Sequence, residues 1–273
     1  TLIADESSYA RATAEHAGNV HDMYLDLKGK DAYSGIDHWL DVMDAPYKFI
    51  ENSTMYSGIY EAARADGVGV MLTGARGNYT ISWGSAIDYY AELIRRARIA
   101  SFVREVRHFG RRHRVGVARV LPLVLKTAFP YLAQPPFRKT EPLLLPLVHP
   151  ELAAHANLSD RLRHIGAGAG NGRGHYDIAA DRERYFSNSA MFSMQGTIAT
   201  KISLAYGIRE RDPTADVRLI RFCLSVPIEQ FMRGGIGRSL CRRATEGILP
   251  DKVRLNARVR GGQAADWLFR VLP

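Results

Sequence analysis

The chain has 273 residues, of which 46% are hydrophobic, and this size and composition predict a globular protein of one or two domains with a sizeable core. Its formal net charge of +9 suits an anionic partner such as ATP or nucleic acid but does not discriminate between them. Cys223 and Cys241 lie in helical patterns, so we expect small buried residues in a reducing compartment and no disulfide. No Cys/His cluster has zinc-ligand spacing, and we expect no bound zinc.

Residues 1–110 carry a mixture of helix and strand patterns. We predict a helix at about 5–17, a strand near 19–27, a helix at about 54–66, a strand at 68–72 and helices through 84–109. Such alternation is typical of an α/β protein.

Residues 111–180 are rich in Pro, Gly, Arg and His, and we interpret them as a connector. Within it, the apolar segment 120–137 is interrupted by Pro122, Lys126 and Pro130 before it reaches the roughly 20 apolar residues of a spanning helix. We therefore predict a kinked, buried connector there and no membrane partner. The glycine-rich segment 166–174 matches no phosphate-binding motif and is expected to be a flexible loop.

The densest basic patch, residues 95–119, could lie along phosphates on one helical face. No nucleic-acid motif accompanies it, so we interpret it as a solvated, arginine-rich helix and expect no nucleic-acid partner.

Residues 181–273 have mostly helical patterns. Asp212 ahead of Pro213 predicts a helix start, and Gly247 with Pro250 beyond it predicts a helix end. We therefore expect a helical part that follows the α/β part and the connector along the chain.

The stretch from Gly67 to Gly84 is the strongest candidate binding loop. The apolar run 68–72 predicts a buried strand, and Thr73, Gly74 and Gly77 follow it directly. Glycines at the carboxyl end of a strand let backbone N–H groups approach a phosphate closely. An ordinary turn between strand and helix remains the alternative.

Residues 207–254 resemble the synthetase domain of the asparagine synthetase family. The matching residues are Arg211, Pro213, Asp216, Val226, Pro227, Gly234, Arg238, Leu240, Arg242, Ala244, Leu249, Pro250 and Val253. The loop after residue 72 fits the same family, as do Glu6, Tyr9 and Ala10 and the segment 146–163, so the resemblance spans nearly the whole chain. It implies an α/β fold of the adenine nucleotide alpha-hydrolase-like (ATP pyrophosphatase) type, with an incomplete parallel sheet and a mostly helical C-terminal half. We predict one partial synthetase domain, 1–273, with an α/β part (1–110), a connector (111–180) and a helical part (181–273).

The resemblance implies that ATP adenylates a carboxylate, pyrophosphate leaves and an amine attacks the acyl adenylate. The implied ATP-binding residues are Thr73, Gly74, Gly77 and Asn78, and the structural motif contributes Arg211 and Asp216. The implied catalytic residues are Arg258, Arg260 and Glu210.

The chain departs from the family's pattern in four respects. An arginine, Arg258 or Arg260, must replace the family's lysine, and Glu210 is shifted by one residue from a family glutamate. Ala75 and Asn78 stand where an acid and a metal-associated Asp are usual. An amide binds Mg²⁺ more weakly than a carboxylate, so Mg²⁺ capture would depend on ATP itself.

These departures leave three hypotheses open: an amide-forming enzyme of the asparagine synthetase type, a lasso-peptide or β-lactam-type macrocyclase of the same superfamily, and an inactive partner-binding fragment. The family's Ser-Gly-Gly-x-Asp-Ser loop and Cys-led glutaminase domain are not in the sequence, so we expect a truncated chain that binds ATP poorly by itself. A carboxylate substrate, small or peptidic, is implied, with a glutaminase domain or a precursor peptide as partner and a cytoplasmic location.

Overall fold

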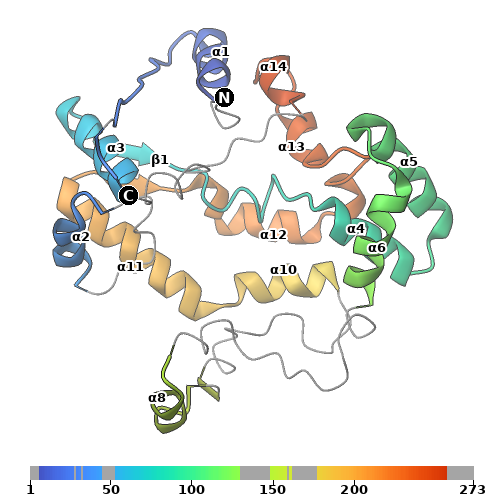
Figure 1. The fold of residues 1–273 in the computed structure, drawn as a ribbon. Helices are drawn as coiled ribbons and strands as arrows, with labels where there is room; N and C mark the ends of the chain where they lie inside the picture. Colours follow the sequence, from blue (N-terminus) through green and yellow to red (C-terminus); the bar gives the residue numbers. More distant parts are fainter. Residues whose placement is uncertain are drawn as a thin grey trace. The chain divides into compact units, whose positions relative to one another are not determined.

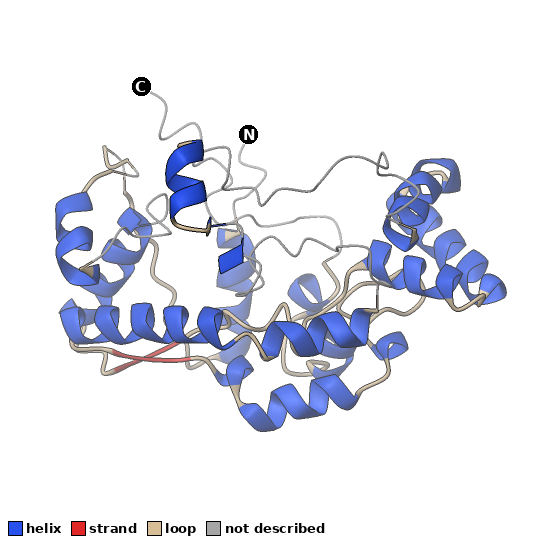
Figure 2. Cartoon of the chain, turned by 90° about the horizontal axis from the view of Figure 1, so that it is seen from below, coloured by secondary structure: helices blue, strands red, loops and turns tan. Residues whose placement is uncertain are grey.

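The computed structural model describes residues 6–27, 29–31, 33–44, 53–129, 148–158, 160–161 and 177–256 (Figure 1). Two compact units share the chain. The first unit comprises residues 1–77, 194–219 and 240–273, and the second comprises 78–193 and 220–239. Helices dominate the described residues, which also contain two short strands, drawn in red in Figure 2.

The first unit contains a parallel pair of strands, β1 (Val70–Leu72) and β2 (Arg209–Arg211). Val70 lies opposite Arg209, and Leu72 lies opposite Arg211. The predicted α/β class with an incomplete parallel sheet is therefore confirmed.

A helix and then a glycine precede each of the two strands. Helix α3 (Ser53–Ala65) precedes β1, and helix α11 (Ser189–Tyr206), whose residues from 194 onward belong to the first unit, precedes β2. Gly67 and Gly207 each have a φ of 70° at these transitions. Glycine adopts this left-handed conformation without the steric cost of a Cβ, so each helix ends sharply and the chain turns into a strand.

An aromatic and aliphatic core joins helices α3 and α11 to a third helix in the first unit. It comprises Trp39 and Met43 of α2 (Ile36–Met43), Tyr60 of α3, Ile202 and Tyr206 of α11, and Ile208. The rings of Tyr60 and Tyr206 lie 5.2 Å apart between centroids. This cluster covers one face of the sheet, where Met71 packs against it.

The first unit also contains α1 (Ser7–Ala17), α14 (Asp251–Arg254) and, except for its first residue, α13 (Ser239–Ala244). The ammonium group of Lys252 donates to the carbonyl of Ser8 at 3.0 Å and lies 5.5 Å from the centroid of the Tyr9 ring. These contacts join α14 to α1.

The second unit is helical in its described residues. Helix α4 (Ala86–Arg95) packs against α5 (Ile99–His113) and α6 (Val117–Ala128) through Tyr90, Leu93, Phe102, Val106, Val120, Val124 and Ala128. Its other helices are α8 (Pro150–His155), α10 (Ile178–Phe186), most of α12 (Val217–Ser225) and the 3₁₀ turn η4 (Ile228–Gln230).

A buried cation organises the centre of the second unit. The guanidinium of Arg182, on α10, donates to the carbonyl of Cys223 at 3.0 Å and lies 4.7 Å from the centroid of the Phe231 ring. Burial lowers the pKa of this guanidinium and raises the pKa of the Cys223 thiol. Cys223 is a fully buried free cysteine, as predicted from its helical pattern, and Cys241 is a half-buried free cysteine.

Two sequence predictions of strands need correction. The strand predicted near 19–27 is absent, since no described strand lies beside this segment to pair with it, and Val20 and Met23 are exposed. The strand at 68–72 exists as β1, but Val70 and Leu72 are exposed rather than buried, since the described helices cover only one face of the sheet.

The predicted connector contains more regular structure than expected. Residues 117–128 form α6, with Pro122 inside the helix, and several of its apolar side chains are exposed instead of buried. The remainder of segment 120–137 beyond residue 129, and the glycine-rich segment 166–174, lie outside the described residues. Among the described helices, none combines the length and apolar character needed to cross a bilayer.

Candidate nucleotide site

The carboxyl ends of β1 and β2 meet at one edge of the sheet. The backbone N–H of Thr73 donates to the carbonyl of Arg211 at 2.8 Å, which extends the pairing one residue past β1. In open α/β sheets, ligands bind outside the carboxyl ends of the strands. The loop that begins at Thr73 therefore occupies the position where this fold class binds ligands.

Asp212 ties this loop to the segment that follows β2. Its Oδ2 accepts a hydrogen bond from the backbone N–H of Arg76 at 2.9 Å. Its Oδ1 accepts from the backbone N–H and the hydroxyl of Thr214, at 2.9 Å and 2.5 Å, and caps the 3₁₀ turn η3 (Pro213–Ala215). One carboxylate thus holds both segments at the sheet edge.

The loop closes on itself and leaves a few polar groups available. The N–H of Gly77 donates to the carbonyl of Gly74 at 3.0 Å. Within the part of the chain that the structure describes, the N–H groups of Gly74 and Ala75 have no hydrogen-bond partner, and neither does the buried hydroxyl of Thr73. A Cβ added at Gly74 would meet open space. The backbone donors of the exposed residues Gly74 and Ala75 are therefore available to an anion, whereas the Thr73 hydroxyl is buried and Gly77 contributes to the turn.

Glu210 lies in β2 and not in a helix. A shift of one residue along a strand moves a side chain to the opposite face of the sheet, so Glu210 does not share a face with its neighbour Arg209. The carboxylate of Glu210 accepts a hydrogen bond from the Tyr60 hydroxyl at 2.5 Å, beside the aromatic core. Burial and, secondarily, the charge of Glu210 raise the pKa of Tyr56. The structure thus gives Glu210 a partner in the core, and its catalytic role stays a prediction.

Arg209 and Arg211 flank Glu210 and are exposed on the other face. The guanidinium of Arg211 donates to the carbonyl of Glu210 at 2.9 Å, so it lies beside the strand end that also holds Thr73. The guanidinium of Arg211 is therefore a positive charge at the sheet edge where the loop begins.

Asp216 precedes α12 and accepts from the backbone N–H of Arg218 at 2.8 Å, as an N-cap does. The Arg218 guanidinium lies 2.7 Å from Oδ2 of the same carboxylate. This side-chain hydrogen bond, followed by the backbone one, lowers the pKa of Asp216 to about 2. The helix predicted to start at Asp212 and Pro213 thus begins as a 3₁₀ turn, and the α-helix α12 starts only after Asp216.

Asn78 lies at the start of the second unit, and its side-chain oxygen accepts from the Arg238 guanidinium at 3.2 Å. Segment 237–238 passes close to Gly84, where an added Cβ would approach the backbone nitrogen of Arg238 to 2.4 Å. Arg258 and Arg260 lie outside the described residues, so the catalytic role that the resemblance implies for them stays a prediction.

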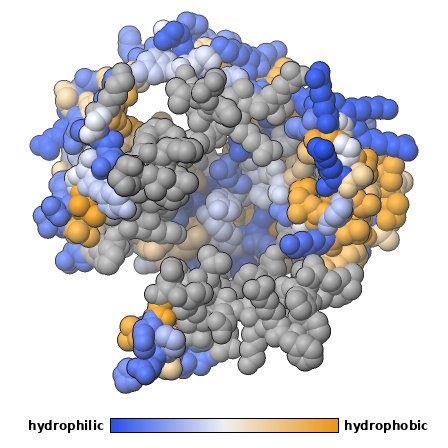
Figure 3. Space-filling view, in the orientation of Figure 1, coloured by the Kyte–Doolittle hydropathy of each residue, from blue (hydrophilic) through white to orange (hydrophobic). Residues whose placement is uncertain are grey.

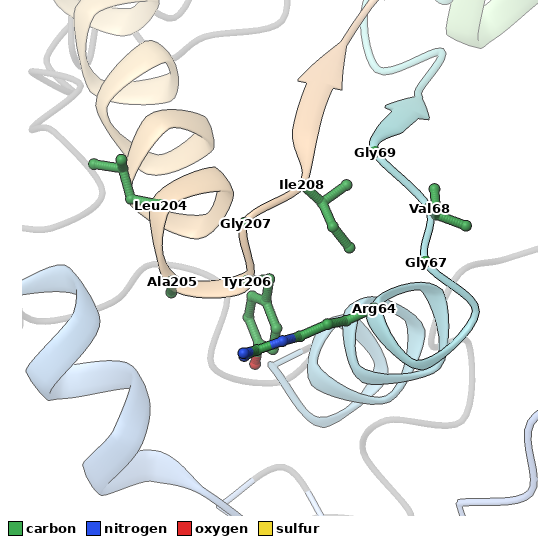
Figure 4. A pocket seen from close by; sticks show the side chains of 9 residues that line it. All are labelled: Arg64, Gly67, Val68, Gly69, Leu204, Ala205, Tyr206, Gly207 and Ile208. Atoms are coloured by element: carbon green, nitrogen blue, oxygen red, sulfur yellow. The ribbon is translucent and has the colours of Figure 1, made fainter.

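A cavity of about 480 Å³ lies at the opposite, amino ends of the two strands (Figure 4). It is lined by Arg64, residues 67–69 and residues 204–208. The final residues of α3 and α11 converge there, and helix carboxyl ends disfavour phosphate. We do not place the nucleotide there. Among the described residues, no group of three or more His, Cys, Asp or Glu side chains has a metal-binding arrangement.

Sequence reasoning missed the link between Asp212 and Arg76 and the open N–H of Ala75. An Asp directly before a Pro is a signal for a side-chain turn, which predicts the Thr214 contacts but not a partner 136 residues away.

No curated protein and no solved structure matches the chain. The sequence model of the family described as asparagine synthase matches residues 3–271. This match agrees with the parallel strands and with the loop at their carboxyl ends, and it covers almost the whole chain. The chain belongs to the asparagine synthase family.

Proposed function

We propose that the complete protein forms an amide bond through an acyl adenylate, with ATP as its co-substrate. The family is one of ATP-using ligases. The proposal rests on donors without a partner at the carboxyl end of β1. These are the N–H groups of Gly74 and Ala75, directly after Thr73 and its buried hydroxyl.

In this proposal, the N–H groups of Gly74 and Ala75 bind a phosphate group of ATP, and the exposed guanidinium of Arg211 balances its charge. Preorganised donors of this kind stabilise charge that builds up in a transition state, and each can supply about 3 kcal/mol. Mg²⁺ would be held mainly by the phosphates, since an amide such as Asn78 is a weaker ligand than a carboxylate. Arg258 or Arg260 remains our candidate for the cation that the family obtains from lysine.

Ala75 and Asn78 also bear on which carboxylate is activated. Both differ from the acidic residues usual in synthetases that act on aspartate, which favours a diverged substrate such as a peptide carboxylate and hence a macrocyclase. Asparagine formation, and binding of a partner without catalysis, are the alternatives. ATP-dependent chemistry of this kind fits a cytoplasmic location.

Gly74→Val tests the site. The added side chain would meet open space in the folded chain, so we expect an unchanged unfolding midpoint but loss of ATP–pyrophosphate exchange in the complete protein. Gly69→Val is the matched control, because Gly69 also faces open space but lies before β1, at the other end. Unchanged exchange in Gly74→Val would show that the loop does not approach the nucleotide.

Arg211→Ala tests the charge, with Arg209→Ala as its control on the same strand face. Loss of one transition-state contact predicts about a 100-fold slower exchange for Arg211→Ala alone. Arg260→Ala and Arg258→Ala, measured in the same assay, then decide whether a C-terminal arginine adds a second cation. Equal rates for Arg211→Ala and Arg209→Ala would remove Arg211 from the site.

A further inference from the structure

The surface of helices α5 and α6, in the second unit, carries positive charges and no exposed negative charge of its own. Residues 99–128 contain seven Arg or Lys residues and one acid, Glu105. Glu105 is buried and accepts a hydrogen bond from the backbone N–H of Gly235 at 2.9 Å, so its charge is withdrawn from the surface. The remaining exposed charges are Arg104, Arg107, Arg111, Arg112, Arg114, Arg119 and Lys126.

These basic side chains lack the ion pairs that neighbouring arginines have. Just before α5, Arg96 lies 2.5 Å from the Glu92 carboxylate, and Arg98 pairs with Glu229. Within the described residues, none of the seven basic side chains of α5, α6 and their junction forms an ion pair. The charge is therefore available to an external anion.

On α5 the basic residues follow the helical period. Arg104, Arg107 and Arg111 fall on one face, three or four residues apart, while Phe102 and Val106 on the other face are buried in the core. This face is fixed by the packing of the opposite side and does not need a partner in order to form.

Exposed aliphatic side chains accompany the charges. Ile99 and Val103 on α5, and Val117, Leu123 and Leu125 on α6, are between 37% and 53% exposed. Figure 3 shows apolar surface beside hydrophilic side chains where these helices lie. Leu123 and Leu125 lie within one helical turn of Lys126, so apolar and basic groups share the surface of α6.

We infer that the α5–α6 surface binds an anionic lipid bilayer peripherally. Basic residues attract the headgroups, and aliphatic residues enter the boundary between headgroups and acyl chains, as in amphipathic interfacial helices. A nucleic-acid backbone would engage the cations but leave the aliphatic side chains in water. A bilayer leaflet of uniform negative charge complements both features.

This surface is separate from the proposed nucleotide site and does not depend on it. It also departs from the expectation of no membrane partner, because that expectation concerned a spanning segment and this contact is peripheral.

Sedimentation of the full chain with vesicles tests the inference. We expect binding to vesicles of phosphatidylcholine with phosphatidylglycerol, little binding to phosphatidylcholine alone, and weakening with added salt. Arg107→Glu with Arg111→Glu should weaken binding about 25-fold or more, since each basic residue near an anionic surface contributes about fivefold. Arg184→Glu with Arg221→Glu is the control of equal charge change, because both residues are exposed in the second unit outside α5 and α6.

Ile99→Ser with Leu123→Ser separates a bilayer from a nucleic acid. Loss of aliphatic insertion should weaken vesicle binding several-fold while leaving binding to duplex DNA unchanged. Circular dichroism and urea unfolding check that each variant is folded. Absence of binding to anionic vesicles, equal losses in the two charge variants, or unchanged vesicle binding in the serine variant with tight DNA binding would each overturn the inference.

Discussion

Asp212→Ala should both destabilise the protein and disorganise the candidate nucleotide loop. The substitution removes three hydrogen bonds, one from the N–H of Arg76 and two from Thr214. Losing an N-cap costs about 1 kcal/mol, and losing the charged acceptor of a loop N–H costs about 1 to 2 kcal/mol more. We therefore expect unfolding to become easier by about 2 to 3 kcal/mol in urea.

The effect on catalysis should exceed the effect on stability. A misplacement of about 1 Å at a reacting group can lower a rate about 100-fold, so ATP–pyrophosphate exchange should fall by that order, with KM for ATP raised. Asp212→Asn should retain part of the cap while presenting an amide in place of one carboxylate oxygen, so its loss of stability should be smaller.

Asp177→Ala provides the matched control. Asp177 caps α10 by accepting from the N–H groups of Ala179 and Ala180, at 2.8 Å and 3.2 Å, in the second unit. We expect a similar capping loss, about 1 kcal/mol, with normal exchange. Exchange that is unaffected by Asp212→Ala at saturating and low ATP would refute the view that this carboxylate positions the loop.

Three other predictions concern stability and reactivity. Tyr60→Phe removes the hydrogen bond to the Glu210 carboxylate and should destabilise the fold by about 1 to 3 kcal/mol in urea unfolding; an unchanged midpoint would mean that the carboxylate finds another donor. Cys223 is fully buried, and burial raises the pKa of its thiol, so iodoacetamide should modify it only after unfolding, as followed by mass spectrometry. The pKa of Asp216, held at about 2 by Arg218 against an ordinary value of 3.8, predicts a stabilising contribution that is complete above pH 3.8 and lost as the pH falls toward 2. The difference in unfolding midpoint between the wild type and Asp216→Asn should disappear over that range, and a constant difference would contradict the assignment.

Local patterns in the sequence were sufficient to locate several of the helices and the loop, but not the individual helices α2, α6, α8, α10 and α11. The helices at 7–17, 53–65, 86–95 and 99–113 depend on apolar spacing close in the chain, so their positions could be predicted. The family could be recognised as well, because its motifs are short and ordered along the sequence, and the match over residues 3–271 confirms it.

The tertiary structure alone decided what depends on pairing between distant segments. Arg209–Arg211 is a polar triplet without strand propensity, and it is a strand because β1 lies beside it. Residues 19–27 were predicted as a strand but form none, and no described strand lies beside them to pair with their backbone groups.

The same reason explains which residues of the candidate site could be predicted from the sequence and which could not. Thr73 and Gly74 were predicted because a strand and glycines adjoin in sequence, whereas the contact between Asp212 and Arg76 joins residues 136 positions apart. Glu210 faces Tyr60 because the alternation of β2 and the helix packing together select its side of the sheet. Sequence therefore determined where the elements and the loop lie, and tertiary structure decided which side chains meet, because a hydrogen bond depends on distance in space and not along the chain.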